Sequence, residues 1–120
     1  MLYCPTGSAS YDFYGGDRLG DNLYANSVLA LEAKTGKLKW HRQLVHHDLW
    51  DYDLPAKPVL LNVGARPVLA QVTKMGFVWF LDRRTGEPVF GSEERAAAPS
   101  AVPGEKAAAT QPWPVRPQPL

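Results

Sequence analysis

The stretch Leu29-Ala-Leu-Glu-Ala-Lys-Thr-Gly-Lys-Leu-Lys-Trp40 has a second copy in the chain, Trp79-Phe-Leu-Asp-Arg-Arg-Thr-Gly-Glu-Pro-Val-Phe90. Each copy joins a β-prone run, an acidic residue, a Thr-Gly pair and a second run that carries an aromatic residue. Glycine supplies the positive φ that closes a tight hairpin, and the aromatic can pack between neighbouring units. Gly36 and Gly86 lie 50 positions apart, a spacing that suits a four-stranded propeller blade. Two unrelated hairpins are the alternative, because Thr-Gly turns are common.

The rest of the chain is also divided into short β-prone runs bounded by turn residues. No window has a convincing helical period over the length of a usual helix. The sequence therefore predicts an all-β fold, with strands at Leu2–Thr6, Tyr24–Ala33, Leu38–Leu44, Val59–Val63, Val68–Thr73 and Phe77–Leu81. Propellers typically need about four to eight blades, and isolated repeats leave core faces exposed. We therefore expect roughly two blades of a larger ring.

The last quarter of the chain differs in composition from the rest. Residues 93–120 are rich in proline and alanine. Proline removes a donor from a β-ladder and pushes the preceding residue towards extended geometry. We predict blade repeats over residues 1–92, and a Pro/Ala-rich loop or inter-blade crossing without blade strands over residues 93–120. A proline-rich peptide ligand is the alternative for this tail.

Charge, cysteine content and hydropathy exclude several classes of function. The chain has 13 basic and 12 acidic side chains, so its net charge of +1 gives no reason to expect nucleic acid or an anionic membrane as a partner. Cys4 is the only cysteine, which rules out an internal disulfide. No stretch resembles a secretory signal or approaches the roughly 20 apolar residues that span a bilayer. We expect any export signal to lie outside this sequence.

The most unusual polar segment runs from His46 to Asp53. It contains three carboxylates, two imidazoles and two large aromatic residues within eight positions. Such a segment is poor strand material, so it forms either a solvated loop or a site. Adjacent His46 and His47 would point to opposite faces of an extended chain, which favours a loop-shaping role over metal binding. Trp50 could exclude water from Asp51 and raise its basicity; a solvated loop aspartate is the alternative.

Residues 46–58, His-His-Asp-Leu-Trp-Asp-Tyr-Asp-Leu-Pro-Ala-Lys-Pro, resemble the active-site segment of a known enzyme family. The family comprises the membrane-bound quinoprotein glucose dehydrogenases and their quinate and polyol relatives, which depend on pyrroloquinoline quinone (PQQ). Four further segments resemble the same family in the same order: Tyr14–Arg18, Gly20–Ser27, Gln71–Phe77 and Leu81–Gly86. The resemblance implies an eight-bladed β-propeller. It also implies that the repeats are its tryptophan-docking motif, with Trp40 and, less faithfully, Phe90 as the aromatic residues.

The resemblance also implies a cofactor site, with PQQ held beside Ca²⁺ or Mg²⁺ near the propeller axis. Asp51 corresponds to the catalytic base and metal neighbour, and Lys74 to the residue that polarises the quinone carbonyl. Ser8 stands where many relatives have a metal-binding asparagine. Asp12 matches an acidic position and would be a substitute ligand, because hard cations prefer carboxylate oxygen. The implied metal ligands are therefore Asp51, Asp12 and Ser8.

The resemblance finally implies an activity, a location and partners. A sugar, polyol or related alcohol would be oxidised by hydride transfer to PQQ, with electrons passing to ubiquinone. The parent protein would be periplasmic and anchored to the inner membrane by sequence outside this chain. The chain itself would need the remaining propeller blades and would be inactive in isolation. A non-enzymatic propeller that acts as a scaffold or assembly protein of the bacterial envelope is the alternative. Such a protein would not need Asp51 and Lys74.

Overall fold

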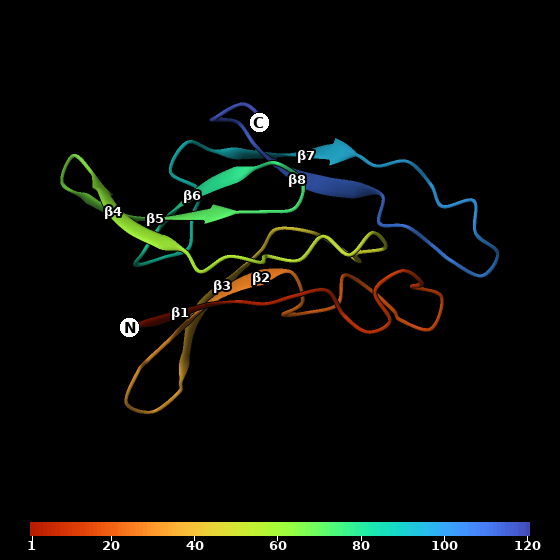
Figure 1. The fold of residues 1–120 in the computed structure, drawn as a ribbon, viewed down its shortest axis with the longest axis horizontal. Helices are drawn as coiled ribbons and strands as arrows, with labels where there is room; N and C mark the ends of the chain where they lie inside the picture. Colours follow the sequence, from red (N-terminus) through yellow and green to blue (C-terminus); the bar gives the residue numbers. More distant parts are fainter.

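The computed structural model describes residues 1–120 and contains eight β-strands and no helix. Each of the six predicted segments overlaps a strand, so the prediction of an all-β fold is confirmed. The strands form three antiparallel sheets, in which neighbours in sequence are neighbours in space (Figure 1). The sheets comprise β1 (Leu2–Pro5), β2 (Ser27–Leu31) and β3 (Leu38–Gln43); β4 (Val59–Val63), β5 (Arg66–Val72) and β6 (Val78–Asp82); and β7 (Ser92–Ala96) with β8 (Thr110–Pro114).

The two sequence copies form the same hairpin. In both, the glycine N–H donates a hydrogen bond of 2.8 Å to the carbonyl oxygen of the acidic residue, Glu32 in one copy and Asp82 in the other. The N–H of that acidic residue donates back to the carbonyl oxygen of the residue after the glycine, also at 2.8 Å. Gly36 has a φ of 72° and Gly86 a φ of 75°, the left-handed geometry that glycine adopts without steric cost. The two copies of the sequence repeat therefore also share one local structure.

Trp40 connects the first repeat to the second. Its indole N–H donates to the carbonyl oxygen of Arg83 at 3.1 Å, and its ring packs against Gly86. The prediction that this aromatic packs between neighbouring units is confirmed. Trp40 also belongs to the apolar core that the first two sheets share, which comprises Val28, Ala30, Trp40, Leu44, Leu54, Leu69, Phe77, Trp79 and Leu81. Burying these side chains together fixes the two sheets relative to each other.

The prediction that residues 93–120 contain no strand is wrong, because two strands form there. β7 pairs with β8, and the stretch expected to be a loop or crossing supplies most of both strands. Val115 N–H donates to Gly91 at one end of this ladder, and Ala97 N–H donates to Ala109 at the other. Because hydrogen-bonded pairs alternate along an antiparallel ladder, the two prolines of β8 fall on positions whose N–H is not needed. Their spacing of two residues therefore permits the strand.

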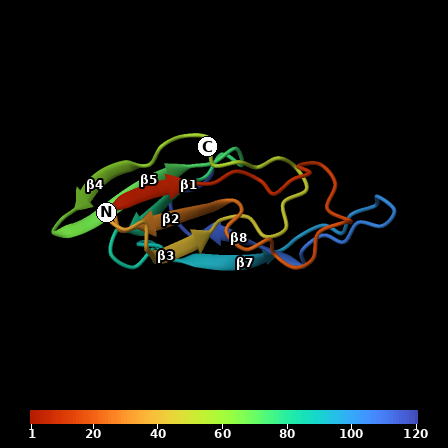
Figure 2. The same ribbon diagram turned by 90° about the horizontal axis from the view of Figure 1, so that it is seen from below.

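The long connections leave the sheets at one end of the molecule. The β1–β2, β3–β4 and β7–β8 loops extend to the right in Figure 1, and the β5–β6 turn lies at the same end of its own sheet. The two repeat hairpins turn at the opposite end, and the view in Figure 2 shows the same separation. Side chains from distant parts of the sequence therefore meet at the loop end. None of the chain forms a helix with the length and apolar character needed to cross a membrane.

Candidate active site

Asp51 and Lys74 meet at the loop end of the molecule. Asp51 lies in the β3–β4 loop and Lys74 in the turn between β5 and β6. The ammonium nitrogen Nζ of Lys74 lies 2.8 Å from Oδ2 of Asp51 and 2.6 Å from Oδ2 of Asp53. All three side chains are about one-third exposed, so the cluster is open to a ligand. The fold therefore brings together the two residues that the sequence assigned to chemistry.

The contacts in the cluster favour the charged forms of Lys74 and Asp53. The hydrogen bonds to Asp51 and Asp53 raise the pKa of Lys74 above its ordinary value. The hydrogen bond from Lys74, helped by one from the backbone N–H of Ser8, lowers the pKa of Asp53. Lys74 is thus a fixed cation and Asp53 a fixed anion at neutral pH. A fixed ammonium on an accessible surface can stabilise negative charge that develops on a bound carbonyl oxygen.

Sequence reasoning missed Asp53. It shares the segment with Asp48 and Asp51, and nothing local distinguishes the roles of the three carboxylates. In the structure Oδ1 of Asp53 accepts the N–H of Ser8 at 2.8 Å, while its Oδ2 accepts Lys74. Asp53 therefore connects the β1–β2 loop to the β5–β6 turn through the middle of the site.

The three residues that the resemblance implied as metal ligands have separate surroundings in the structure. Ser8 reaches the site through its N–H, and its hydroxyl donates to Asp48. Asp12 lies exposed in the β1–β2 loop. No group of three or more histidine, cysteine, aspartate or glutamate side chains converges where it could hold a metal ion. Asp51 and Asp53 carry hard oxygen ligands of the kind that Ca²⁺ and Mg²⁺ prefer, and the Lys74 ammonium lies where their Oδ2 atoms converge. Their remaining oxygen lone pairs fit part of a coordination shell.

The two aromatic residues of the segment stack on each other. The rings of Trp50 and Tyr52 lie 5.5 Å apart at an angle of 29°. Trp50 is 38% exposed, and the side chain of Asp51 is 30% exposed. The dry surroundings that the sequence predicted for Asp51 are therefore not produced by this chain alone.

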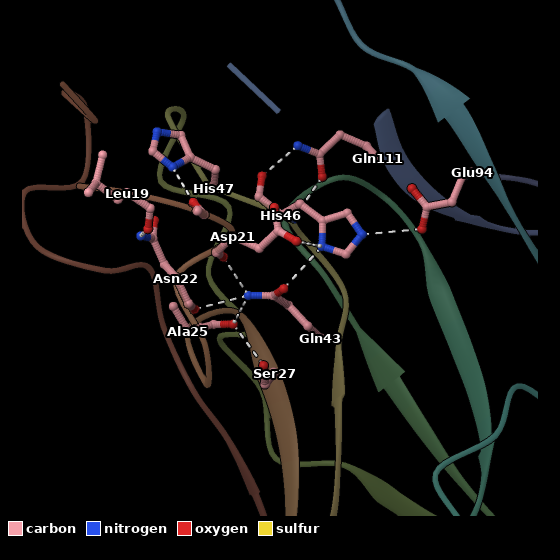
Figure 3. A network of polar contacts seen from close by, with 11 residues as sticks. Leu19, Asp21, Asn22, Ala25, Ser27, Gln43, His46, His47, Glu94 and Gln111 are labelled. Carbon is pink, nitrogen blue, oxygen red and sulfur yellow. Dashed lines mark hydrogen bonds and ion pairs between the residues drawn. The ribbon is translucent and has the colours of Figure 1, made fainter. Parts of the chain in front are cut away.

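The adjacent histidines have separate, structural partners. Figure 3 shows His46 with its Nδ1 3.0 Å from Oε1 of Gln43 and its Nε2 3.2 Å from Oε1 of Glu94. The Nδ1 of His47 lies 2.7 Å from the carbonyl oxygen of Gly20, on the other side of the loop. The expected loop-shaping role is therefore what the contacts show.

A cavity of 490 Å³ lies between the β1–β2 and β7–β8 loops. Arg18, Asp21, His47 and Lys106 line it together with backbone from several glycines. Arg18 also donates to the carbonyl oxygen of Asp48 at 2.8 Å, so this cavity adjoins the segment that carries Asp51.

The structure contains blade-like antiparallel sheets, two of which are joined by a tryptophan that packs on a glycine turn. A lysine–carboxylate cluster lies at one end of these sheets. Together these features define part of an enzyme-type β-propeller. The family model "PQQ: Glucose/ethanol/alcohol dehydrogenase, beta-propeller domain" matches residues 1–120. The chain belongs to this family of PQQ-dependent dehydrogenases, and the resemblance seen in the sequence is confirmed.

Individual relatives agree with this assignment. The quinoprotein glucose dehydrogenase of Escherichia coli (strain K12) is 42% identical over 118 residues, which cover 94% of this chain and 15% of the relative. The quinate/shikimate dehydrogenase (quinone) of Acinetobacter baylyi is 42% identical over 117 residues, covering 92% of this chain and 14% of the relative.

A solved structure shows the same fold. The quinohemoprotein alcohol dehydrogenase ADHIIG of Pseudomonas putida HK5 superposes with a TM-score of 0.66 and 33% identity, covering 76% of this chain and 15% of the other. The chain thus spans about 15% of the length of the relatives that it matches.

Proposed function

We propose that this chain forms part of the catalytic face of a PQQ-dependent dehydrogenase that oxidises a sugar, a polyol or a related alcohol. The observation that carries the proposal is the contact of 2.8 Å between Lys74 Nζ and Asp51 Oδ2. Oxidation of an alcohol needs a base for the hydroxyl proton and a cation beside the electron acceptor. A scaffold propeller needs neither, and no contact in this chain favours that alternative.

The chain's own residues would divide this work. Asp51 is exposed enough to meet a substrate and would accept the hydroxyl proton on its carboxylate. Lys74 is held by two carboxylates and would donate a hydrogen bond to the quinone carbonyl oxygen. Asp53 would keep the ammonium in place. Bound PQQ would supply the two-electron acceptor that no amino-acid side chain provides.

The metal, the electron acceptor and the location belong to the same proposal. Ca²⁺ or Mg²⁺ would bind beside Asp51, with Asp12 and Ser8 as further candidate ligands on the β1–β2 loop. Ubiquinone would receive the electrons, and the parent protein would work in the periplasm, anchored to the inner membrane. The remaining blades would supply the other cofactor and substrate contacts, because this chain spans a small part of its relatives.

The test uses the complete protein that contains this chain, reconstituted with PQQ and Ca²⁺. Dye reduction is measured with glucose, glycerol and quinate for the wild type, for Asp51→Asn and for Asp17→Asn. Asp17 is exposed and has no hydrogen-bond partner in the structure, so its variant is a matched control for the same chemical change. We expect Asp51→Asn to lower turnover by about 100-fold or more, the usual effect of losing a general base. Full turnover in Asp51→Asn, or no turnover in the wild type with any alcohol, would contradict the proposal.

A further inference from the structure

We propose that Asp48 is the positioning residue of Asp51, because it clamps the backbone on both sides of that residue. This inference rests on the proposed function, in which Asp51 is the base. Asp48 itself is 1% exposed and its carboxylate oxygens are already bonded, so it cannot meet a substrate. Its role would be exerted through the geometry of its neighbour.

The clamp consists of two hydrogen bonds from the backbone to the Asp48 carboxylate. Oδ1 of Asp48 accepts the backbone N–H of Trp50 at 2.9 Å, and Oδ2 accepts the backbone N–H of Tyr52 at 2.6 Å. The residue between these two amides is Asp51. One buried carboxylate therefore holds the Leu49–Trp50 and Asp51–Tyr52 peptide groups, which lie on either side of the candidate base.

The backbone at this point needs such a restraint. Asp51 has a φ of 59° and His47 a φ of 42°, so two residues other than glycine adopt the left-handed region within five positions. This conformation is unfavourable for a residue with a Cβ, and it persists where the surroundings impose it. A loop free to relax would turn Asp51 towards ordinary geometry and move its carboxylate away from Lys74.

Asp48 is itself fixed from several directions. Nδ2 of the buried Asn26 donates to Oδ2 of Asp48 at 2.9 Å, and the hydroxyl of Ser8 donates to the same oxygen. Arg18 donates to the carbonyl oxygen of Asp48 at 2.8 Å. The groups around Oδ2 are donors, and so is the Trp50 N–H at Oδ1. A carboxylate accepts at both positions, whereas the NH2 group of an asparagine would face an N–H or O–H donor at one of them. Burial makes such a mismatch costly.

The first measurement needs no variant and does not depend on activity. In the wild-type protein without cofactor, amide hydrogen exchange is followed residue by residue across the loop by NMR. The N–H groups of Trp50 and Tyr52 are bonded to Asp48, while that of Asp51 has no partner in the structure. We expect the two clamped amides to exchange at least about tenfold more slowly than the amide of Asp51, after correction for intrinsic rates. Equal rates at all three positions would overturn the clamp.

The second measurement asks whether the clamp serves the base. Asp48→Asn is compared with Asp17→Asn in the complete, reconstituted protein. We expect Asp48→Asn, which keeps only one acceptor oxygen, to raise the exchange of the Trp50 or the Tyr52 amide by about tenfold or more, and to lower kcat while KM for the alcohol stays within about twofold. The control should change neither quantity.

The outcomes separate this inference from the function on which it rests. If Asp51→Asn abolishes turnover while Asp48→Asn keeps the wild-type kcat despite faster exchange, Asp48 does not position the base. If Asp51→Asn is fully active, the proposed function fails, and the exchange data alone decide whether the clamp exists. If Asp48→Asn does not fold, the wild-type exchange pattern still confirms or overturns the clamp.

Discussion

The indole of Trp40 lies so close to Gly86 that a Cβ added to this glycine would be 2.5 Å from Cε3 of the ring. The same indole donates its N–H to the carbonyl oxygen of Arg83 at 3.1 Å. Gly86 is thus required twice, once by its φ of 75° and once by the ring that packs on it. Gly36, its counterpart in the first repeat, has a φ of 72° and no atom within 4 Å of the same position.

The two glycines form a matched pair for substitution. We expect Gly36→Ala to lower the free energy of unfolding by about 1 kcal/mol, because only the backbone is strained. Gly86→Ala should cost a further 1–3 kcal/mol or so, because the methyl group displaces the Trp40 ring. Urea unfolding of both variants measures the difference. Equal losses would show that Trp40 does not pack on Gly86 in solution.

Lys74→Met tests the cation of the candidate site. Methionine keeps the length of the side chain and removes the charge, which leaves Asp51 and Asp53 without their shared partner. We expect turnover of the complete, reconstituted protein to fall by about 100-fold, in the range seen when a group that stabilises developing charge is removed. Lys34→Met, in the exposed turn at the opposite end, is the control and should keep wild-type turnover. Comparable activity of the two variants would remove Lys74 from the mechanism.

Gln111→Ala tests the connection between the tail and the segment His46–Asp53. Nε2 of Gln111 donates to the carbonyl oxygen of His46 at 2.6 Å, and its Oε1 accepts the N–H of His46 at 2.8 Å (Figure 3). Removing the amide leaves both backbone groups of the half-buried His46 without a protein partner, at a cost of up to about 1–3 kcal/mol for each group. Thermal unfolding should therefore show a clear loss of stability, whereas Gln118→Ala at the exposed C-terminal end should not. An unchanged melting temperature for Gln111→Ala would show that water replaces the amide.

The buried carboxylate of Asp82 is expected to make the free energy of unfolding depend on pH. Its carboxylate is 2% exposed, and hydrogen bonds from Arg84 and then Arg66 hold its pKa well below its usual range. The unfolded chain binds a proton near the ordinary value of about 3.9, so this stabilisation is fully present above that pH. It is lost as the pH falls below about 4 towards the lowered pKa of the folded state.

The variant Asp82→Asn isolates this contribution. We expect its melting temperature to lie several degrees below that of the wild type at pH 7, with a smaller gap at pH 3. Asp17→Asn should follow the wild-type curve at both values. A gap that stays constant from pH 7 to pH 3 would mean that the Asp82 carboxylate is not the titrating group.

Local chemistry accounts for what the sequence predicted well. The strands, the paired Thr-Gly turns and the packing role of Trp40 depend on residues close together in the chain, and each is found in the structure. The strand β8 was missed for a local reason as well. Its prolines suggest a loop by composition, and only their spacing of two residues shows that both can avoid the hydrogen-bonded side of the ladder.

The site depended on more than local pattern. Asp51 and Lys74 came from the resemblance to a family, and their contact joins two loops across 23 positions of sequence. The roles of Asp48 and Asp53 were invisible because three carboxylates in six residues look alike until their partners are known. The chain therefore encodes its strands and turns through neighbours in sequence. Which donors each carboxylate binds is decided only when the sheets pack and bring distant loops together.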